Sequence, residues 1–350
     1  MASHGIEIRN LYKIFGPNEK FHMEAARQGV SKAELNDQHH HVLGLRDISI
    51  AMPGGEITVV MGLSGSGKST LIRHINRLIE PTAGEVLYDG TDICAMSPAQ
   101  LRDFRRRKTA MVFQKFGLLP HRTVLENAVY GLDIQGMPRR ESLAKGRSWL
   151  ERVGLSGFED HYPNQLSGGM QQRVGLARAL ATDADILLMD EAYSALDPLI
   201  RVDMQTMLIE LQQELKKTVV FITHDLDEAL RLGDKIAILR DGEVVQQGSG
   251  QDIVLRPADD YIAAFVREVN RGRVIRIGTV MQAPDSQSGR FRLDQRKTLE
   301  VAAREMVEAG VTKAQVTDAA GREVGAIDLS MLLSAMVSPA TSVEARLAAE

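Results

Sequence analysis

The sequence has a single cysteine, Cys94, so it cannot form a disulfide within one chain. It also lacks a basic-then-apolar signal pattern at its N-terminus. No window approaches the roughly 18–20 uninterrupted apolar residues of a membrane span. The net charge of −4 implies no global attraction to nucleic acid. We therefore expect a soluble, intracellular protein in a reducing compartment, which could act at a membrane only by docking onto a protein that spans it.

The composition is that of an ordinary globular protein, with 44% hydrophobic and 25% charged residues over 350 positions. This length predicts about two domains. The informative features are therefore local motifs, and each lies at the end of an apolar run.

The first motif is Gly-Leu-Ser-Gly-Ser-Gly-Lys-Ser-Thr at residues 62–70, between an apolar run at 57–61 and a helical pattern at 71–75. A strand, a glycine-rich turn, Lys-Ser and a helix form a P-loop in its required context. The glycines allow successive N–H groups to turn inward beside the positive end of the helix. Lys68 would reach the β- and γ-phosphates, and the Ser69 hydroxyl would ligate Mg²⁺. The residues predicted to hold a nucleoside triphosphate are Gly62, Leu63, Ser64, Gly65, Ser66, Gly67, Lys68, Ser69 and Thr70.

Two carboxylates, Asp190 and Glu191, close the apolar run at 186–189. Asp190 could hold Mg²⁺, and Glu191 could act as the general base that deprotonates the attacking water. A simple turn would also explain two acids, but their place after a P-loop favours catalysis. His224 follows a β-branched run at 218–223, at a strand end where α/β sheets bind ligands. It could contact the γ-phosphate and position Glu191, or it could be structural.

A second phosphate-binding pattern, Leu-Ser-Gly-Gly-Met-Gln-Gln-Arg at 166–173, precedes a helical run at 174–181. Ser167, Gly168 and Gly169 would leave free N–H groups at the helix start, although Ser167 could simply cap the helix. The P-loop at 62–70 already supplies the phosphate-binding loop for one nucleotide. The second pattern therefore predicts a head-to-tail pair of chains, each completing the ATP site of the other.

Residues 16–42 are polar and weakly patterned, and we interpret them as an insertion with a short helix near 31–35. Its three histidines at 39–41 cannot converge on one metal, so we expect a solvated turn. Two aromatic residues, Tyr12 and Phe15, lie at the end of a predicted strand at 6–11. Either could stack on adenine or belong to the core.

In this order, the motifs resemble those of ABC-transporter ATPases, over about residues 6–265. The matching residues are 62–70, Gln114, 166–169, Asp190, Glu191, 194–197 and His224. The resemblance implies an α/β P-loop NTPase with a RecA-like core, an antiparallel β subdomain, a helical subdomain at 116–166 and an ATP-sandwich dimer. It implies that Gln114 senses Mg²⁺ and that Asp197 contacts the nucleotide. It also makes Phe15 the preferred adenine-stacking residue and Tyr12 the second choice.

Within that family the chain resembles the ATPases of quaternary-amine importers, the glycine betaine, proline and choline group. The similar segments are the insertion and residues 61–64, 76–82, 189–201 and 223–229. Met170 and Ala192 depart from the general family pattern but resemble this subgroup. The resemblance implies a peripheral subunit on the cytoplasmic face of the inner membrane. Its partners would be integral permease subunits, contacted by the apolar loop at 116–120, and indirectly a periplasmic binding protein.

Two alternatives stay open. One is an importer ATPase for histidine, proline or another solute. The other is a soluble ABC-type ATPase that acts on nucleic acid or ribosomes.

The remaining chain divides into a basic and polar linker at 266–290 and a small pattern at 291–350. We expect a helix at 298–308, strands at 314–318 and 325–328, and a helix at 329–335. This order resembles one cystathionine-β-synthase (CBS) motif. Such motifs normally occur in pairs, so a regulatory pairing between two chains is one interpretation. A degenerate, mostly disordered remnant is the other.

Overall fold

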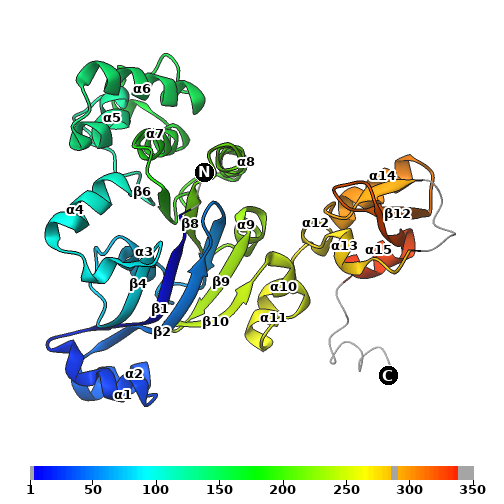
Figure 1. Cartoon of the computed structure of the whole chain (residues 1–350), viewed down its shortest axis with the longest axis horizontal. Helices are drawn as coiled ribbons and strands as arrows, with labels where there is room; N and C mark the ends of the chain where they lie inside the picture. The colour runs from blue at the N-terminus through cyan, green and yellow to red at the C-terminus, as the bar shows by residue number, and fades with distance from the viewer. Residues whose placement is uncertain (1–3, 285–290, 338–350) are drawn as a thin grey trace. The chain divides into compact units, whose positions relative to one another are not determined.

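The structure is a computed structural model that describes residues 4–284 and 291–337 (Figure 1). The chain divides into two compact units, residues 1–247 and 248–350. The helices α10 (Gly250–Leu255) and α11 (Asp260–Val266) fall within the second unit. The sequence boundary at residue 265 would place them with the ATPase domain, and that functional boundary stays a prediction.

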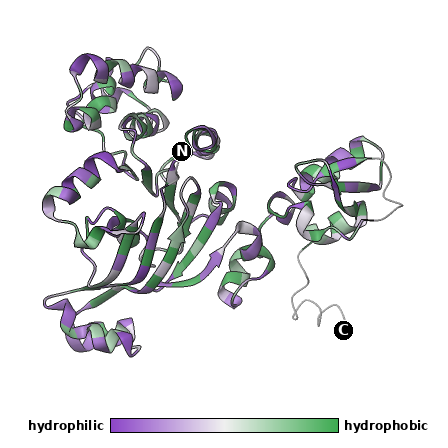
Figure 2. Cartoon of the chain, in the orientation of Figure 1, coloured by the Kyte–Doolittle hydropathy of each residue, from purple (hydrophilic) through white to green (hydrophobic). Residues whose placement is uncertain are grey.

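A six-stranded sheet with strand order β10-β9-β3-β8-β7-β6 forms the centre of the first unit. Its strands are β3 (Ile57–Met61), β6 (Thr109–Phe113), β7 (Ile186–Asp190), β8 (Thr218–Thr223), β9 (Lys235–Arg240) and β10 (Glu243–Gly248). β3, β7 and β8 are buried along their whole length, as expected for parallel strands covered on both faces. The central strands are accordingly hydrophobic (Figure 2).

The register of these parallel strands brings their carboxyl ends to one edge of the sheet. Met61 of β3 pairs with Thr223 of β8, and Asp190 of β7 pairs with Ile222 of the same strand. The residues that follow each strand therefore meet at this edge, where α/β sheets place their ligands.

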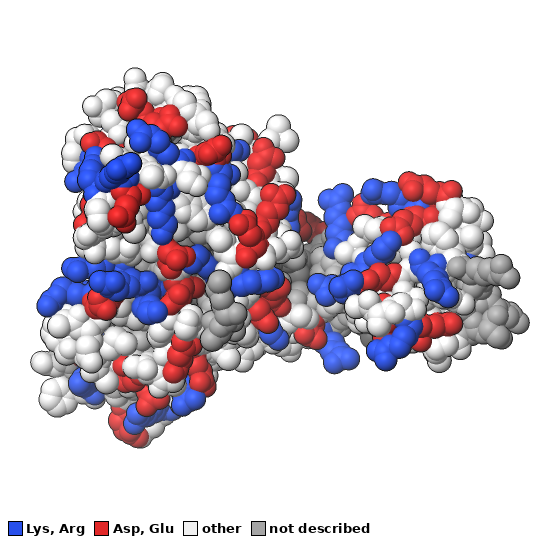
Figure 3. Space-filling model, turned by 45° about the horizontal axis from the view of Figure 1, so that its top comes forward, with Lys and Arg blue, Asp and Glu red and all other residues white. Residues whose placement is uncertain are grey.

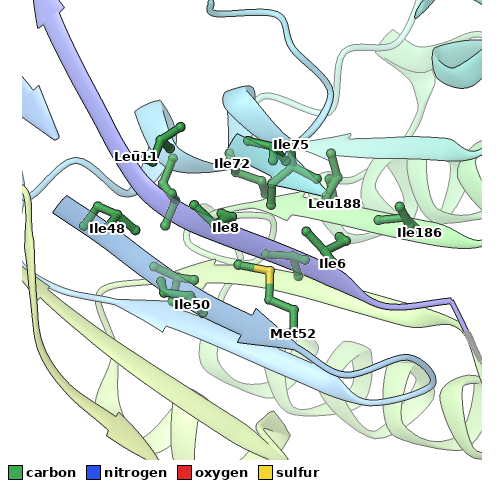
Figure 4. Packing of buried hydrophobic residues seen from close by; sticks show 14 of the residues in the cluster. Ile6, Ile8, Leu11, Ile48, Ile50, Met52, Ile72, Ile75, Ile186 and Leu188 are labelled. Atoms are coloured by element: carbon green, nitrogen blue, oxygen red, sulfur yellow. The ribbon is translucent and has the colours of Figure 1, made fainter. Parts of the chain in front are cut away.

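The second sheet of this unit has the order β2-β1-β4-β5 and consists of β1 (Ile6–Phe15), β2 (Val42–Met52), β4 (Ala83–Tyr88) and β5 (Thr91–Asp92). Its pairings are antiparallel, which confirms the expected β subdomain. One core joins the two sheets through α3 (Lys68–Ile75). Ile72 and Ile75 of α3 belong to the same buried cluster as Ile8 of β1 and Leu188 of β7 (Figure 4).

The insertion leaves the second sheet between two paired residues, Phe15 and Val42. It contains η1 (Glu19–His22), α1 (Met23–Arg27) and α2 (Lys32–His39). Its helices pack in a separate apolar cluster made of Tyr12, Ile14, Met23, Ala26, Leu35 and Leu43. We expected the histidine turn to be solvated, and this expectation is wrong for His41, which is buried. Its ring nitrogens lie 2.6 and 2.7 Å from the carbonyl oxygens of His39 and Pro17.

The helical segment expected at 116–166 is present. It contains α5 (Val124–Gln135), α6 (Arg139–Arg152) and the short turn η3 (Pro163–Gln165), and α5 and α6 pack on α7 (Gly168–Ala181). Sequence signals set its boundaries. Thr123 and Glu126 form a capping box at the start of α5, and Gly136 ends that helix in the left-handed conformation.

Three further helices complete the first unit: α4 (Pro98–Arg107), α8 (Pro198–Leu215) and α9 (Leu226–Leu232), together with the turn η2 (Ile93–Ala95). Basic and acidic side chains are interspersed over the visible surface (Figure 3), as the small net charge leads one to expect.

The second unit contains the expected helix, two strands and helix: α14 (Leu299–Glu308), β12 (Lys313–Thr317), β13 (Glu323–Asp328) and α15 (Leu329–Met336). A short strand that the sequence analysis missed, β11 (Arg292–Asp294), pairs in parallel with β12. Its buried side chains include Leu293, Leu299, Met306, Val316 and Leu332. The described part of this unit therefore has a packed apolar core.

The expected linker at 266–290 is largely folded in the described residues. It forms α12 (Arg271–Val274) and α13 (Ile277–Val280), and Ile275 and Ile277 are fully buried. Most of the polar stretch at 283–289 and the end of the chain after residue 337 lie outside the described residues.

Candidate nucleotide site

The P-loop connects β3 to α3 at the sheet edge described above. Gly65 and Gly67 have φ angles of 80° and 101°, in the left-handed region that favours glycine. A Cβ atom on Gly67 would lie 2.9 Å from the carbonyl oxygen of Gly44, so no other residue fits without a shift. Ser64, Gly65, Gly67, Lys68, Ser69 and Thr70 line a cavity of about 320 Å³. This volume suits a small-molecule ligand.

Lys68 extends back along the loop. Its side chain is only 4% exposed, and its ammonium donates to the carbonyl oxygens of Gly62 at 2.8 Å and Leu63 at 3.0 Å. Burial lowers the pKa of Lys68, while the nearby carboxylates of Glu191 and Asp190 oppose that shift. The ammonium thus lies at the floor of the loop, where an anionic ligand would be its natural partner.

Ser69, which lines the cavity, and Asp190 come from different elements but are in direct contact. The Ser69 hydroxyl donates to an Asp190 carboxylate oxygen at 2.9 Å, and Arg73 lies 3.6 Å from the other oxygen. Hydroxyl and carboxylate oxygens are the ligands that Mg²⁺ prefers. This oxygen pair next to a phosphate-type loop therefore fits the predicted metal.

Glu191 is the centre of a cluster of predicted catalytic groups. Its carboxylate lies 3.9 Å from Lys68 Nζ and 3.6 Å from His224 Nδ1, and it accepts a hydrogen bond from Gln114 Nε2 at 3.2 Å. Its backbone has a φ of 46°, which turns the chain sharply after β7. Ser194, not named individually as a site residue from sequence, also accepts from Gln114 and donates to the Glu191 carbonyl.

Ser167 and Asp197 have local structural roles within this chain. Ser167 caps α7 by accepting from Met170 N at 3.3 Å, and Asp197 caps α8 by accepting from Ile200 N at 3.1 Å. Gly168 is exposed and Gly169 is partly exposed at the start of α7. None of these four residues lines the P-loop cavity in the described structure. Their predicted contact with nucleotide therefore depends on a second copy of the chain.

The two candidate aromatic residues have different environments. Phe15 lines the P-loop cavity, is 37% exposed and has the Lys13 ammonium 5.2 Å from its ring centroid. Tyr12 packs in the apolar cluster of the insertion and does not line that cavity. Sequence reasoning missed Lys32 and Val42, which also line it. The pairing of Phe15 with Val42 places both ends of the insertion there, and no sequence motif marks that pairing.

Comparisons with known proteins agree with this geometry. Residues 45–194 match the family model described as ABC transporter. The chain is 48% identical over 322 residues to the glycine betaine transport ATP-binding protein OpuAA of Bacillus subtilis, covering 92% of this chain and 76% of that protein. It is 54% identical over 269 residues to the glycine betaine/proline betaine transport ATP-binding protein ProV of Escherichia coli, covering 77% of this chain and 67% of ProV.

A solved structure gives the same result. The dimeric ATP-binding cassette MJ0796, in a post-hydrolysis state bound to ADP and Pi, superposes with a TM-score of 0.60 at 33% identity. The match covers 70% of this chain and 98% of that one. The chain therefore belongs to the ATP-binding proteins of ABC transporters, a family of P-loop ATPases that drive transport. No helix among the described residues is long and apolar enough to cross a membrane.

Proposed function

We propose that this chain is the ATP-hydrolysing subunit of an importer for a small quaternary amine, such as choline, glycine betaine or proline betaine. The observation that supports ATP hydrolysis is the contact of Lys68, Gln114 and His224 with Glu191, which lines the P-loop cavity. The cargo class is supported by relatives that align over almost the whole chain. One of these, the glycine betaine/carnitine transport ATP-binding protein GbuA of Listeria monocytogenes, is 46% identical over 98% of this chain and 85% of its own length.

In this proposal, ATP lies in the P-loop cavity with its adenine on Phe15. Backbone N–H groups of the loop and the Lys68 ammonium hold the β- and γ-phosphates. Ser69, Asp190 and Gln114 would hold Mg²⁺, which when bound neutralises part of the phosphate charge.

Hydrolysis requires a base next to the γ-phosphate. Glu191 lines the cavity, and its carboxylate would accept the proton of the water that attacks phosphorus, so that ADP and inorganic phosphate leave. His224 and Gln114 reach the same carboxylate and would keep it oriented toward that water. Their role here is positional.

The partner copy would supply Ser167, Gly168, Gly169 and Asp197 to the γ-phosphate side of this ATP. Support comes from the full or partial exposure of these residues at helix starts outside the lining of their own P-loop cavity, and from the dimeric state of the MJ0796 structure. ATP would then close the pair, and hydrolysis would reopen it. Closure would move integral permease subunits, which receive cargo from a periplasmic binding protein, with the ATPase on the cytoplasmic face of the membrane.

The C-terminal unit would act as a single CBS-like regulatory motif that pairs with the same motif of the second copy. Its packed core supports folding, and its exposed apolar side chains support pairing: Val301, Val307 and Leu333 are 40%, 64% and 54% exposed. A fold this small gains stability from such a partner.

The deciding experiment uses the chain reconstituted with its membrane subunits and binding protein. ATP hydrolysis is measured with choline, glycine betaine, proline betaine and histidine. Selective stimulation by a methylammonium compound supports the proposal and names the cargo. Stimulation by histidine alone would replace the cargo class, and equal basal activity with all four would reject the importer assignment.

A further inference from the structure

Lys32 lies at the nucleotide cavity although it belongs to the insertion and not to any phosphate-binding motif. The cavity is lined by residues of the P-loop and by Phe15, Lys32, Val42, Leu43 and Gly44. Within the described chain, Lys32 and Lys68 are the two basic residues that line it. The two cations differ in their hydrogen bonding, because Lys68 donates to carbonyl oxygens of its own loop.

The position of Lys32 is fixed by the fold of the insertion. It is the first residue of α2, and the preceding Ser31 caps that helix by accepting from Glu34 N at 3.1 Å. One turn later, Leu35 is fully buried in the apolar cluster with Leu43. Leu43 also lines the cavity. Because residues three apart lie on the same side of a helix, the anchor at Leu35 holds the start of α2 at the cavity.

The Lys32 ammonium has N–H donors but no hydrogen-bond acceptor among the described residues. It makes no hydrogen bond or ion pair with any residue of 4–284 or 291–337, although the side chain is half-buried. Burial lowers its pKa, and the more distant carboxylates of Asp241 and Glu243 only oppose that shift. Glu243 is itself paired with Arg46 at 3.1 Å. An ammonium with three unused N–H donors favours an anionic ligand at this place.

We propose that Lys32 binds the phosphate chain of the nucleotide, as a second cationic contact beside that of Lys68. This inference rests on the proposed ATP site and assigns the insertion a direct part in it. The contact is charge-assisted and partly exposed, so it adds affinity for triphosphate over uncharged adenosine and weakens with salt.

The test measures binding of a fluorescent ATP analogue, and its displacement by ATP, ADP and adenosine, with the full-length chain. Lys32→Met should weaken ATP binding about fivefold to tenfold, leave adenosine binding within about twofold, and reduce the salt dependence of ATP affinity. Lys32→Arg keeps the charge and should stay near wild type. Lys20→Met is the matched control, because it removes the same charge from an exposed position of the same insertion.

Equal ATP affinity for Lys32→Met and Lys20→Met would overturn the proposal. So would an equal loss for ATP and adenosine, because that pattern places Lys32 at the base or ribose. If the wild-type chain bound no ATP, the proposed function itself would fail. Circular dichroism and thermal unfolding of each variant separate loss of contact from loss of fold.

Discussion

At the scale of single residues, Glu191 is the proposed general base and also has an unusual backbone conformation. Its left-handed φ of 46° costs about 1 kcal/mol for a residue with a side chain, yet it directs the carboxylate into the cavity beside Lys68. A conformation of this kind is retained where the surrounding structure holds it in place, here through Gln114 and Ser194.

Glu191→Gln preserves the size of this side chain and removes the base. We expect ATP binding to stay near wild type, and hydrolysis to fall by about a hundredfold or more because no group accepts the water proton. Filter binding and phosphate release measure the two quantities. Turnover within about tenfold of wild type would contradict the base assignment. The exposed Glu210→Gln is the control.

His74 on α3 is a buried neutral histidine behind the P-loop. Its Nδ1 bonds the Thr70 carbonyl at 2.7 Å, its Nε2 has no protein partner, and burial lowers its pKa to about 4. The unfolded chain, with an ordinary histidine pKa near 6.5, binds this proton first as pH falls. His74 therefore subtracts stability progressively between about pH 6.5 and 4.

The measurement is urea unfolding at pH 7 and pH 5. Wild type should lose about 2 kcal/mol more than His74→Asn over this interval, because only wild type carries the titrating ring. The exposed His121→Asn should behave as wild type. Identical pH dependence in His74→Asn and wild type would show that His74 does not titrate in this way.

Most of the site could be predicted from residue type and spacing, because phosphate and metal chemistry demand particular residues in particular order. Lys68, Ser69, Asp190, Glu191, Gln114 and His224 do lie together. Lys32 could not be predicted, because its place at the cavity depends on how the insertion packs. The burial of His41 depends on the same packing.

At the scale of elements, the serine that caps the start of α7 has two assigned roles. Ser167 caps the helix in this chain, and in the proposed dimer it would also bind the partner's ATP. Ser97 caps α4 in a similar way, through a hydrogen bond from Gln100 N, but is no part of the proposed dimer contact.

Ser167→Ala should lower the free energy of unfolding by about 1 kcal/mol, as Ser97→Ala should, because each removes one cap. Only Ser167→Ala should also weaken ATP-driven dimerisation, by about tenfold or more, in a Glu191→Gln background. Analytical ultracentrifugation with ATP measures this. Equal dimerisation of the two variants would leave Ser167 with its capping role alone.

Element types were predictable because apolar period, caps and turns are local signals, as at α14 and β12. Strand order was not, since β3 pairs with β8 and β9, which occur far later in the sequence. The segment that contains α12 and α13 was interpreted as linker because arginines alternate with its apolar residues, which include Ile275 and Ile277. Their burial is decided by the unit around them.

At the scale of the whole molecule, the second unit and its arginines bear on regulation. Two of the four arginines between 267 and 276 are already engaged within the unit: Arg271 donates to the Ala335 carbonyl, and Arg273 pairs with Glu300 at 2.9 Å. Arg267 and Arg276 remain as candidates to respond to salt or anionic lipid.

Deleting the residues after Phe265 should leave basal ATP hydrolysis of the reconstituted transporter within about threefold of wild type, because the deletion removes none of the residues that line the P-loop cavity. The salt dependence of transport should be lost or reduced. Uptake into vesicles of fixed lipid composition at several salt concentrations tests this. Unchanged salt dependence would remove the regulatory role of the tail.

The strand order of the central sheet also constrains when the nucleotide site can form during synthesis. Ile57 of β3 pairs with Val219, and Thr58 pairs with Lys235. At about 5–20 residues per second, a ribosome makes the P-loop roughly ten to thirty seconds before its flanking strands. A nascent chain carries the phosphate-binding motif for that time without the sheet that shapes it. Nucleotide can therefore stabilise only chains whose synthesis has passed β9, and ATP would favour chains with both flanking strands over shorter ones.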